Sequence, residues 1–261
     1  MDGGVRPELV ARARAWRSAT LAAVCDVTEP WAHGTIVRAT RYPSYFEFNL
    51  VRVEDDPHMS VDELVGFADE ALAGLSHRRI DFDLVEAAEP LRAGFEALGW
   101  RAVRLLSMRH EQSPPPAESD LPVEEVPYDA VHDLRLAWHR EDFPDQDPTR
   151  YHAQAREVAL RRAARVLAVH EAGRPVAFAQ LEHGEDAAEI TRVYVHPDYR
   201  GGGRGTAMMR AAIEAAGDVR DLWIAADDED RPKELYARLG FRPVWTAMEI
   251  TRWPGARAGR G

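Results

Sequence analysis

The stretch from Ile190 to Ile213 constrains the fold of this chain more than any other, because it predicts a strand, a turn, a glycine-rich loop and a helix in direct succession. Residues 190–195 are mostly β-branched or aromatic, which is typical of a half-buried strand. Pro197 ends that strand, since proline has no N–H to donate to a sheet. Apolar residues at helical spacing then continue to Gly217, and glycine is typical of a helix end. This order predicts an α/β protein.

The loop between the strand and the helix has the composition of an anion-binding site. It contains four glycines: Gly201, Gly202, Gly203 and Gly205. Glycines let backbone N–H groups approach a ligand closely, and the helix N-terminus adds roughly half a positive charge. Arg200 and Arg204 add further charge at the same place. Together these features favour a phosphate site, whereas three adjacent glycines by themselves would indicate only a flexible surface turn.

The spacing of the loop residues separates this site from two common phosphate loops. A P-loop requires a lysine that is missing here, and a dinucleotide-binding fingerprint requires glycine where Thr206 stands. The sequence Arg200-x-x-Gly203-x-Gly205, directly after a V-x-V-H-P-x-Y-R run, instead resembles the coenzyme-A loop of the GCN5-related N-acetyltransferase (GNAT) superfamily.

The resemblance implies a cofactor site and a reaction. Acetyl-CoA would be the co-substrate, with its pyrophosphate on the loop amides and its pantetheine and acetyl group along Val193–Val195. The implied activity is direct transfer of an acetyl group to a primary amine, and the alternative is a non-catalytic acyl-CoA-binding sensor or scaffold protein. The implied cofactor-binding residues are Val193, Tyr194, Val195, Arg200, Gly201, Gly202, Gly203, Arg204, Gly205 and Thr206.

Acetyl transfer to an amine requires a proton for the departing thiolate, and Tyr236 is the predicted general acid. It lies in a Leu-Tyr-x-x-x-Gly-Phe motif similar to the family helix whose tyrosine hydroxyl reaches the thioester sulfur. A tyrosine that only packs against a strand is the alternative. The chain departs from the family before this helix, because Glu229 and Pro232 stand where an asparagine and an alanine are common.

The acceptor side is less sharply defined. Glu189 is the candidate general base at the start of the central strand, although it could equally be a solvated strand-end charge. Strand alternation predicts that Glu189, Thr191 and Val193 share one face. Acceptor contacts in the family come from the segment that here contains acids interleaved with aromatic residues, a pattern that suits a cationic amine or, alternatively, an exposed acidic loop. The candidate substrate residues are Trp138, Glu141, Asp142 and Phe143.

An internal repeat indicates that this architecture occurs twice. Residues 95–103 match residues 236–244, with Phe95 opposite Tyr236. Opposite the glycine loop stands His58-Met-Ser-Val-Asp-Glu63, which has no glycine and two acids and should repel a pyrophosphate. We therefore expect two GNAT-like domains of mixed α/β class, each a mostly antiparallel twisted sheet flanked by helices. The expected boundaries are a degenerate domain without a cofactor site (1–111), a Pro-rich linker (112–121), an acetyl-CoA-binding domain (122–252) and a flexible tail (253–261).

Composition narrows the partners and the compartment. The formal net charge of −11 argues against nucleic acid or an anionic membrane as a partner. No apolar run approaches the ~20 residues of a membrane span. Cys25 is the only cysteine, so no intrachain disulfide can form and a cytoplasmic location is expected. We assign no metal ligands and expect a small-molecule or peptide amine as acceptor; the sequence defines neither its identity nor the oligomeric state.

Overall fold

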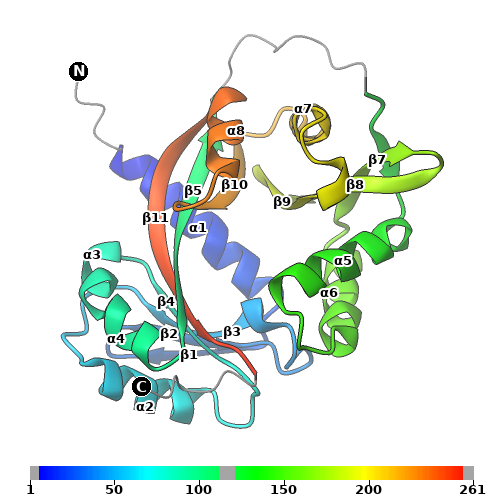
Figure 1. The fold of residues 1–261 in the computed structure, drawn as a ribbon. Coiled ribbons are helices and arrows are strands. Elements are labelled where there is room, and N and C mark those ends of the chain that lie inside the picture. The colour runs from blue at the N-terminus through cyan, green and yellow to red at the C-terminus, as the bar shows by residue number, and fades with distance from the viewer. Residues whose placement is uncertain (1–5, 112–120, 255–261) are drawn as a thin grey trace. The chain divides into compact units, whose positions relative to one another are not determined.

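The computed structural model describes residues 6–111 and 121–254, and its fold is shown in Figure 1. Most of the predicted linker and tail lie outside the described residues. The chain divides into two compact units. The first unit contains the chain up to Ser107, residues Ala226–Asp230 and the chain from Val244 onward. The second unit contains Met108–Ala225 and Arg231–Pro243.

This division differs from the predicted boundary at the C-terminal side. We expected residues 122–252 to form one domain, but β11 (Phe241–Arg252) enters the first unit at Val244. The physical reason is strand pairing, because β11 pairs antiparallel with β4 (Arg78–Phe82) from Met248 opposite Phe82 to Arg252 opposite Arg78. Two further strands, β5 (Arg101–His110) and β10 (Asp221–Asp227), also contribute residues to both units.

The first unit has strands in the order β1-β2-β3-β4-β11, of which only the β3–β4 pair is parallel. Its other strands are β1 (Val27–Trp31), β2 (Gly34–Arg38) and β3 (Asn49–Val53). Its helices are α1 (Pro7–Ala22), α2 (Val61–Ala71), α3 (Val85–Ala88) and α4 (Arg92–Ala97), with short 3₁₀ turns η1 (Phe46–Phe48) and η2 (Glu89–Leu91).

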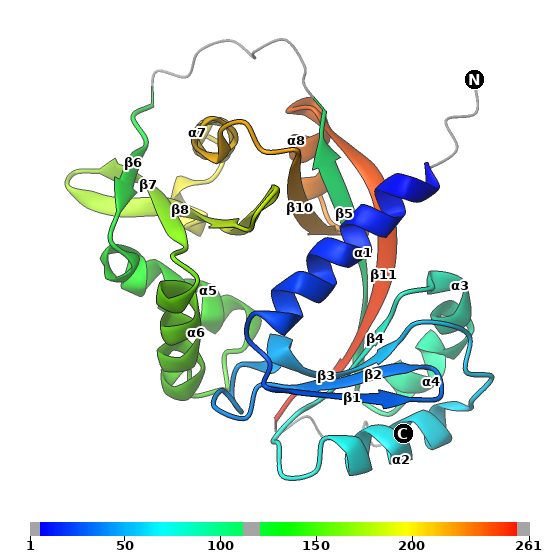
Figure 2. The ribbon, with the colours of Figure 1, turned by 180° about the vertical axis from the view of Figure 1, so that it is seen from behind.

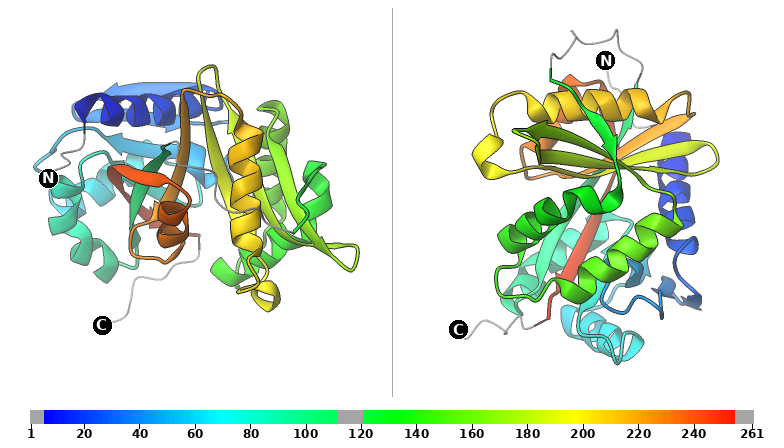
Figure 3. Two further views of the ribbon diagram at one scale, coloured as in Figure 1. Left: turned by 90° about the horizontal axis from the view of Figure 1, so that it is seen from above. Right: turned by 90° about the vertical axis from the view of Figure 1, so that its right-hand side faces the viewer.

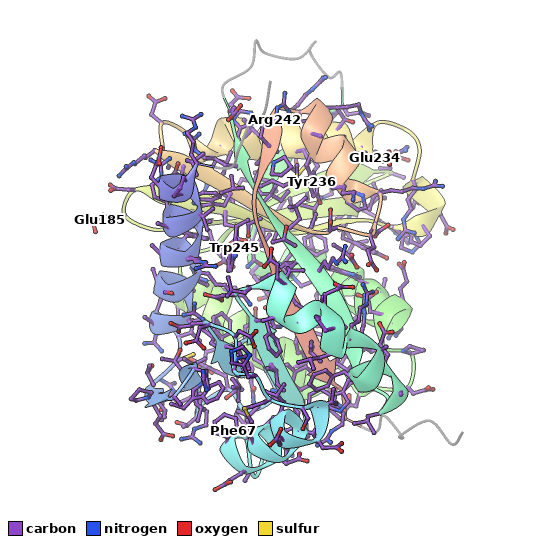
Figure 4. All side chains as sticks on the ribbon, turned by 90° about the vertical axis from the view of Figure 1, so that its left-hand side faces the viewer. Phe67, Glu185, Glu234, Tyr236, Arg242 and Trp245 are labelled. Atoms are coloured by element: carbon purple, nitrogen blue, oxygen red, sulfur yellow. The ribbon has the colours of Figure 1, made fainter. Side chains whose placement is uncertain are left out.

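Strand alternation in the first unit separates an apolar face from a charged one. Val51 and Val53 of β3 pack with Leu64 of α2 in the hydrophobic core. The intervening Arg52 turns to the other face, where it binds Asp83 at 3.0 Å and Ser18 of α1 at 3.0 Å. Figure 2 shows α1 and α2 on opposite sides of these strands. Arg14 and Arg17 of α1 lie over the ring of Trp245, which Figure 4 labels beside this helix.

Two predicted elements of the first unit form differently. The residue pattern predicts a strand over 45–53, but the strand begins only at Asn49. The buried Asn49 side chain donates to the carbonyl oxygens of Tyr42 and Tyr45 and accepts from the Ala39 amide, which holds the preceding residues in turns. The residue pattern also predicts a helix over 89–98, but this region is divided into α3, η2 and α4 around Pro90. Strand β1 was not predicted; Pro30 and an exposed middle section are features of an edge strand.

The free energy of unfolding is expected to fall as the pH drops from about 7.5 to about 5.5, in part because of His77. This side chain is 1% exposed, and burial, only partly offset by the hydrogen bond at Asn49 O, lowers its pKa to about 4. The unfolded imidazole titrates near ~6.5, so the unfolded state takes up the proton first and stability is lost between that pH and about 4. Chemical denaturation at about pH 7.5 and about pH 5.5 measures this change. Between these pH values the free energy of unfolding of His77→Gln should fall by about 1 kcal/mol less than that of the wild type. An identical loss in both proteins would contradict this role.

The second unit has strands in the order β10-β9-β8-β7-β6, of which only the β9–β10 pair is parallel. The remaining strands are β6 (Glu124–Val126), β7 (Arg165–Glu171), β8 (Arg174–His183) and β9 (Ala187–Val195). The helices are α5 (His132–Asp142), α6 (Thr149–Arg161), α7 (Arg204–Ala216) and α8 (Pro232–Arg238), with 3₁₀ turns η3 (Tyr128–Val131) and η4 (Pro197–Tyr199). Figure 3 shows α7 on one side of the strands and α5 and α6 on the other.

Both units confirm the predicted mixed α/β class with mostly antiparallel sheets flanked by helices. The sequence predicts a hairpin around Ala172 and Gly173 and a strand over 101–110, and β7, β8 and β5 confirm both. Among residues 6–111 and 121–254, no helix combines the length and the apolar character that crossing a membrane requires.

Candidate active site

The parallel strands β9 and β10 are paired over only part of their length. Their register runs from Ala187 opposite Asp221 to Ile190 opposite Ile224. Strand β9 then continues to Val195 and β10 to Asp227. Within the described residues, these outer segments are not paired with each other, which leaves main-chain groups of β9 available to an extended ligand.

A β-bulge in β9 lies in this unpaired segment. Tyr194 pairs with Phe178 of β8 and Thr191 pairs with Gln180, so two residues of β9 oppose one of β8. Arg192 accommodates the extra residue with a left-handed φ of 54°. The bulge corrects the predicted alternation, because Tyr194 rather than Val193 shares a face with Glu189 and Thr191. A bulge also leaves backbone groups outside the ladder, next to the place where the strands separate.

The glycine loop forms the predicted connection between β9 and α7. In the described part of the chain, the backbone amides of Gly201 to Thr206 donate no hydrogen bond to a protein group. The amides of Arg204, Gly205 and Thr206 are the unsatisfied donors of the first helical turn. A run of six free N–H groups at a helix N-terminus is an anion cradle, and it fits the diphosphate of a coenzyme-A ester.

The backbone conformation explains two of the loop glycines. Gly201 and Gly203 have φ values of 86° and 78°, which L-residues rarely adopt. Gly205 lies within α7, where an added Cβ would make ordinary van der Waals contacts, 3.5 Å from Leu235 Cδ2 and 3.8 Å from Val195 Cγ2. The same contacts place the start of α7 between the end of β9 and helix α8.

The two arginines of the loop are both held by carboxylates. Arg204 binds Glu171 at the end of β7 and donates to the carbonyl oxygen of Tyr199 at 2.9 Å. Arg200 donates from Nε to the carbonyl oxygen of Val195 at 3.1 Å and from Nη2 to Glu141 Oε2 at 2.8 Å. Arg200 remains half exposed, whereas Arg204 is largely buried, so Arg200 is the more accessible of the two cations.

The candidate substrate residues lie at the C-terminal end of α5, in the same unit as the loop. Trp138 stacks on the Tyr194 ring with a centroid separation of 5.6 Å and an interplanar angle of 12°. Glu141 and Asp142 are the last residues of α5, not part of a loop as predicted, and Phe143 follows them. The Tyr194 hydroxyl donates to Glu141. This anchoring by Tyr194 was not predicted, because the residues involved are far apart in the sequence.

Tyr236 is buried on α8, and its ring meets that of Phe241 edge-on at 6.3 Å. Figure 4 labels Tyr236 and Glu234 of α8, of which Tyr236 is buried and Glu234 is exposed. Leu235, the residue before it, contacts the start of α7, so this turn of α8 borders the loop. In the first unit, Phe95 and Trp100 form a similar edge-on pair at 5.3 Å.

The residue that stands where the family commonly has an asparagine is engaged elsewhere. Glu229 forms a bidentate pair with Arg92, with N–O distances of 2.5 and 2.8 Å. Pro232 begins α8, as its position at a helix start predicts. Neither side chain reproduces the amide of an asparagine.

Glu189 lies on β9 opposite Glu182 of β8 and Trp223 of β10. Glu182 is buried and bound by Arg162, and it also accepts a hydrogen bond from Gln180 at 2.8 Å. These bonds hold Glu182 in place, and Glu189 is partly exposed.

Two histidines between α5 and α6 were not predicted as a group. His139 and His152 have ring centroids 5.2 Å apart, and the Nε2 atom of each is buried without a hydrogen bond. Burial lowers the pKa of both imidazoles, that of His152 to about 4. Among the described residues, no group of three or more histidine, cysteine or acidic side chains is arranged to hold a metal ion.

In the described residues of the first unit, neither structural feature of this site occurs at the positions that the internal repeat aligns with it. The N-terminus of α2 is closed by a capping box, in which Ser60 accepts from the Glu63 amide and Glu63 accepts from the Ser60 amide. Strands β3 and β4 remain paired to their ends at Val53 and Phe82, and the Asp83 amide adds a bond to Val53 O at 2.8 Å. The N-terminus of α2 therefore presents acids, and β3 and β4 leave no gap between their main chains.

Comparison with known families identifies the class of the second half. Residues 128–241 match the acetyltransferase (GNAT) family. The matched segment contains β9, the loop, α7, β10 and α8, which are the elements that form the site. The match to this family agrees with the resemblance that the loop motif predicted.

Several known proteins are similar in sequence to part of this chain. The chain is 35% identical over 80 residues to an uncharacterised N-acetyltransferase of Methanocaldococcus jannaschii and 33% identical over 92 residues to a mycothiol acetyltransferase of Segniliparus rotundus. The matches cover 26% and 34% of this chain and 35% and 34% of those proteins, so the chain spans about a third of their length. A solved GCN5-related N-acetyltransferase from Kribbella flavida is similar over 93% of this chain and 95% of its own, with a TM-score of 0.57 and 16% identity, which shows the fold alone.

Proposed function

We propose that the protein is an acetyl-CoA-dependent N-acetyltransferase that moves an acetyl group directly to a primary amine. The observation that carries this proposal is the run of free amides from Gly201 to Thr206, placed where β9 and β10 separate within the GNAT domain. The cradle fits a diphosphate, and the unpaired edge of β9 fits an extended pantetheine chain. We keep Val193, Tyr194 and Val195 as the proposed contacts on that edge.

The chemistry divides between the strand and α8. Acetyl-CoA supplies the acyl group as an activated thioester. We assign Glu189 to accept a proton from the amine, directly or through water, as the nitrogen attacks the thioester carbonyl carbon. Backbone N–H groups at the bulge are suited to stabilise the developing negative charge on the carbonyl oxygen. When the carbon–sulfur bond breaks, Tyr236 donates its hydroxyl proton to the thiolate.

The acceptor is proposed to be the amine of a small molecule or a peptide that contacts the C-terminal end of α5. Trp138 and Phe143 offer aromatic surface there, and Asp142 offers negative charge. One relative bears the name mycothiol acetyltransferase. We propose a cytoplasmic location, which fits the single reduced Cys25.

A non-catalytic sensor or scaffold that binds acyl-CoA is the competing proposal. The two are separated by following release of the CoA thiol with a panel of amines, with ester hydrolysis measured in parallel. Turnover that depends on an amine supports the enzyme. Tight acetyl-CoA binding without amine-dependent thiol release over the whole panel would favour the sensor.

One chain is expected to bind one acetyl-CoA. The first unit is proposed to be a degenerate GNAT-like domain, since α2 is capped by its own Glu63 and β3 and β4 stay paired to the end. Carboxylates in place of free amides repel a diphosphate, so no weak second site is expected. Titration calorimetry should give a ratio near one. A ratio near two would show that the first unit also binds the cofactor.

A further inference from the structure

Glu141 connects the last turn of α5 to two parts of the cofactor site. Its Oε2 atom accepts from Arg200 Nη2 at 2.8 Å, and its Oε1 atom accepts the hydroxyl of Tyr194. Although burial alone would raise the pKa of Glu141, the hydrogen bonds from Tyr194 and Arg200 lower it, so the carboxylate is charged at neutral pH. One side chain of the acceptor-side helix therefore holds both the loop and β9.

The same turn of α5 has a second contact to β9. Trp138, one turn before Glu141, stacks on the ring of the tyrosine whose hydroxyl Glu141 binds. The helix ends immediately afterwards, where the Phe143 amide donates to the His139 carbonyl oxygen at 2.7 Å. The position of this turn therefore depends on Glu141 and Trp138 together.

Arg200 is the residue for which a diphosphate in the cradle and the Glu141 carboxylate of α5 compete. It directly precedes Gly201, the first of the free amides, and its side chain is 54% exposed. A phosphate oxygen and a carboxylate favour the same guanidinium N–H groups. A diphosphate in the cradle therefore attracts Arg200 away from Glu141, and at the same time Glu141 repels the diphosphate.

We propose that Glu141 is a positioning residue that couples occupancy of the cradle to the C-terminal turn of α5. A bound diphosphate draws Arg200 from Glu141, and the turn that carries Trp138 is then released to receive the acceptor. The proposal rests on the proposed function, because it takes acetyl-CoA as the ligand of the cradle. Linkage requires that the coupling be reciprocal, so α5 in its held position opposes cofactor binding.

The first test is the affinity for acetyl-CoA of a set of matched variants. Glu141→Gln keeps an oxygen for the Tyr194 hydroxyl but removes the charge that competes for Arg200, so it should bind acetyl-CoA about fivefold more tightly than the wild type. Arg200→Gln should bind more weakly, and adding Glu141→Gln to it should change the affinity less than twofold. Asp133→Asn, which removes an exposed charge from the first turn of the same helix, should also change it less than twofold.

The second test observes the helix itself by hydrogen exchange. In the wild type, acetyl-CoA should lower the protection of the amides at the end of α5, including that of Phe143. In Glu141→Gln this protection should already be low and should not respond to acetyl-CoA. A residue that only stabilises the fold would change protection in both states equally.

The outcomes of these tests distinguish the proposed coupling from the proposed function on which it rests. Failure of the wild type to bind acetyl-CoA would overturn the proposed function and the coupling with it. Binding by the wild type, with unchanged or weaker affinity in Glu141→Gln, or with no response of α5 to acetyl-CoA, would overturn the coupling alone.

Discussion

Replacing Gly203 with glutamate is expected to abolish acetyl-CoA binding, with a loss of affinity of more than about a hundredfold, or ~2.7 kcal/mol. Gly203 is the N-cap of α7, and nothing lies within 4 Å of an added Cβ, so the new side chain has room to fold over the cradle. There its carboxylate takes the place of the diphosphate and repels it. Each amide bond to a charged group is worth roughly 1.5–3 kcal/mol, so blocking one or two accounts for the loss.

The control must carry the same backbone strain. A side chain at the φ of 78° of Gly203 costs roughly 1–2 kcal/mol of stability wherever it occurs. Gly74 in the first unit has a φ of 85° and equally open surroundings. Gly74→Glu should therefore destabilise the fold to an extent similar to Gly203→Glu but bind acetyl-CoA as tightly as the wild type. If Gly203→Glu retained affinity within about threefold of the wild type, the loop would not be the diphosphate site.

Replacing Tyr236 with phenylalanine is expected to lower kcat by ~100-fold to ~10,000-fold, the range typical of general acids. The substitution keeps the buried ring and its edge-on contact with Phe241, so the fold should persist. Phe95, which meets Trp100 in the same way in the first unit, shows that such a position packs without a hydroxyl. The affinity for acetyl-CoA should stay within about twofold, since only proton transfer is lost.

Tyr128→Phe is the matched control, because it also removes a hydroxyl from a buried ring of the same unit. Its kcat should be close to that of the wild type. The comparison is made under conditions in which chemistry limits turnover, established by single-turnover kinetics. An unchanged kcat for Tyr236→Phe under those conditions would remove Tyr236 from the mechanism.

Local patterns predicted the elements whose residues are close in sequence. The β9–loop–α7 order and the hairpin of β7 and β8 each depend on short-range chemistry, so their signals lie within a few residues. The loop motif located the site for the same reason, because a helix N-terminus and its glycines are contiguous.

Long-range pairings had no comparable signal. The bulge in β9 depends on the left-handed backbone of Arg192, and arginine is a residue type that does not predict this conformation. The Glu141–Arg200 pair joins residues 59 positions apart, and each alone resembles an ordinary surface charge. The assignment of β11 to the first unit depends on which edge of β4 is available, which is a property of the assembled sheet.

The shared strand β11 has a consequence for how the chain acquires its structure. The first unit cannot complete its sheet until residues beyond Val244 have been synthesised, although its other strands are available much earlier. The edge of β4 that pairs with β11 therefore stays unpaired while the second unit is being synthesised. Unpaired strand edges can associate with other chains. Folding is expected to end with a contact of very long sequence separation, which is intrinsically slow. Cutting the gene at the linker would leave each half short of a strand, so the halves are better viewed as one folding unit than as two modules for exchange.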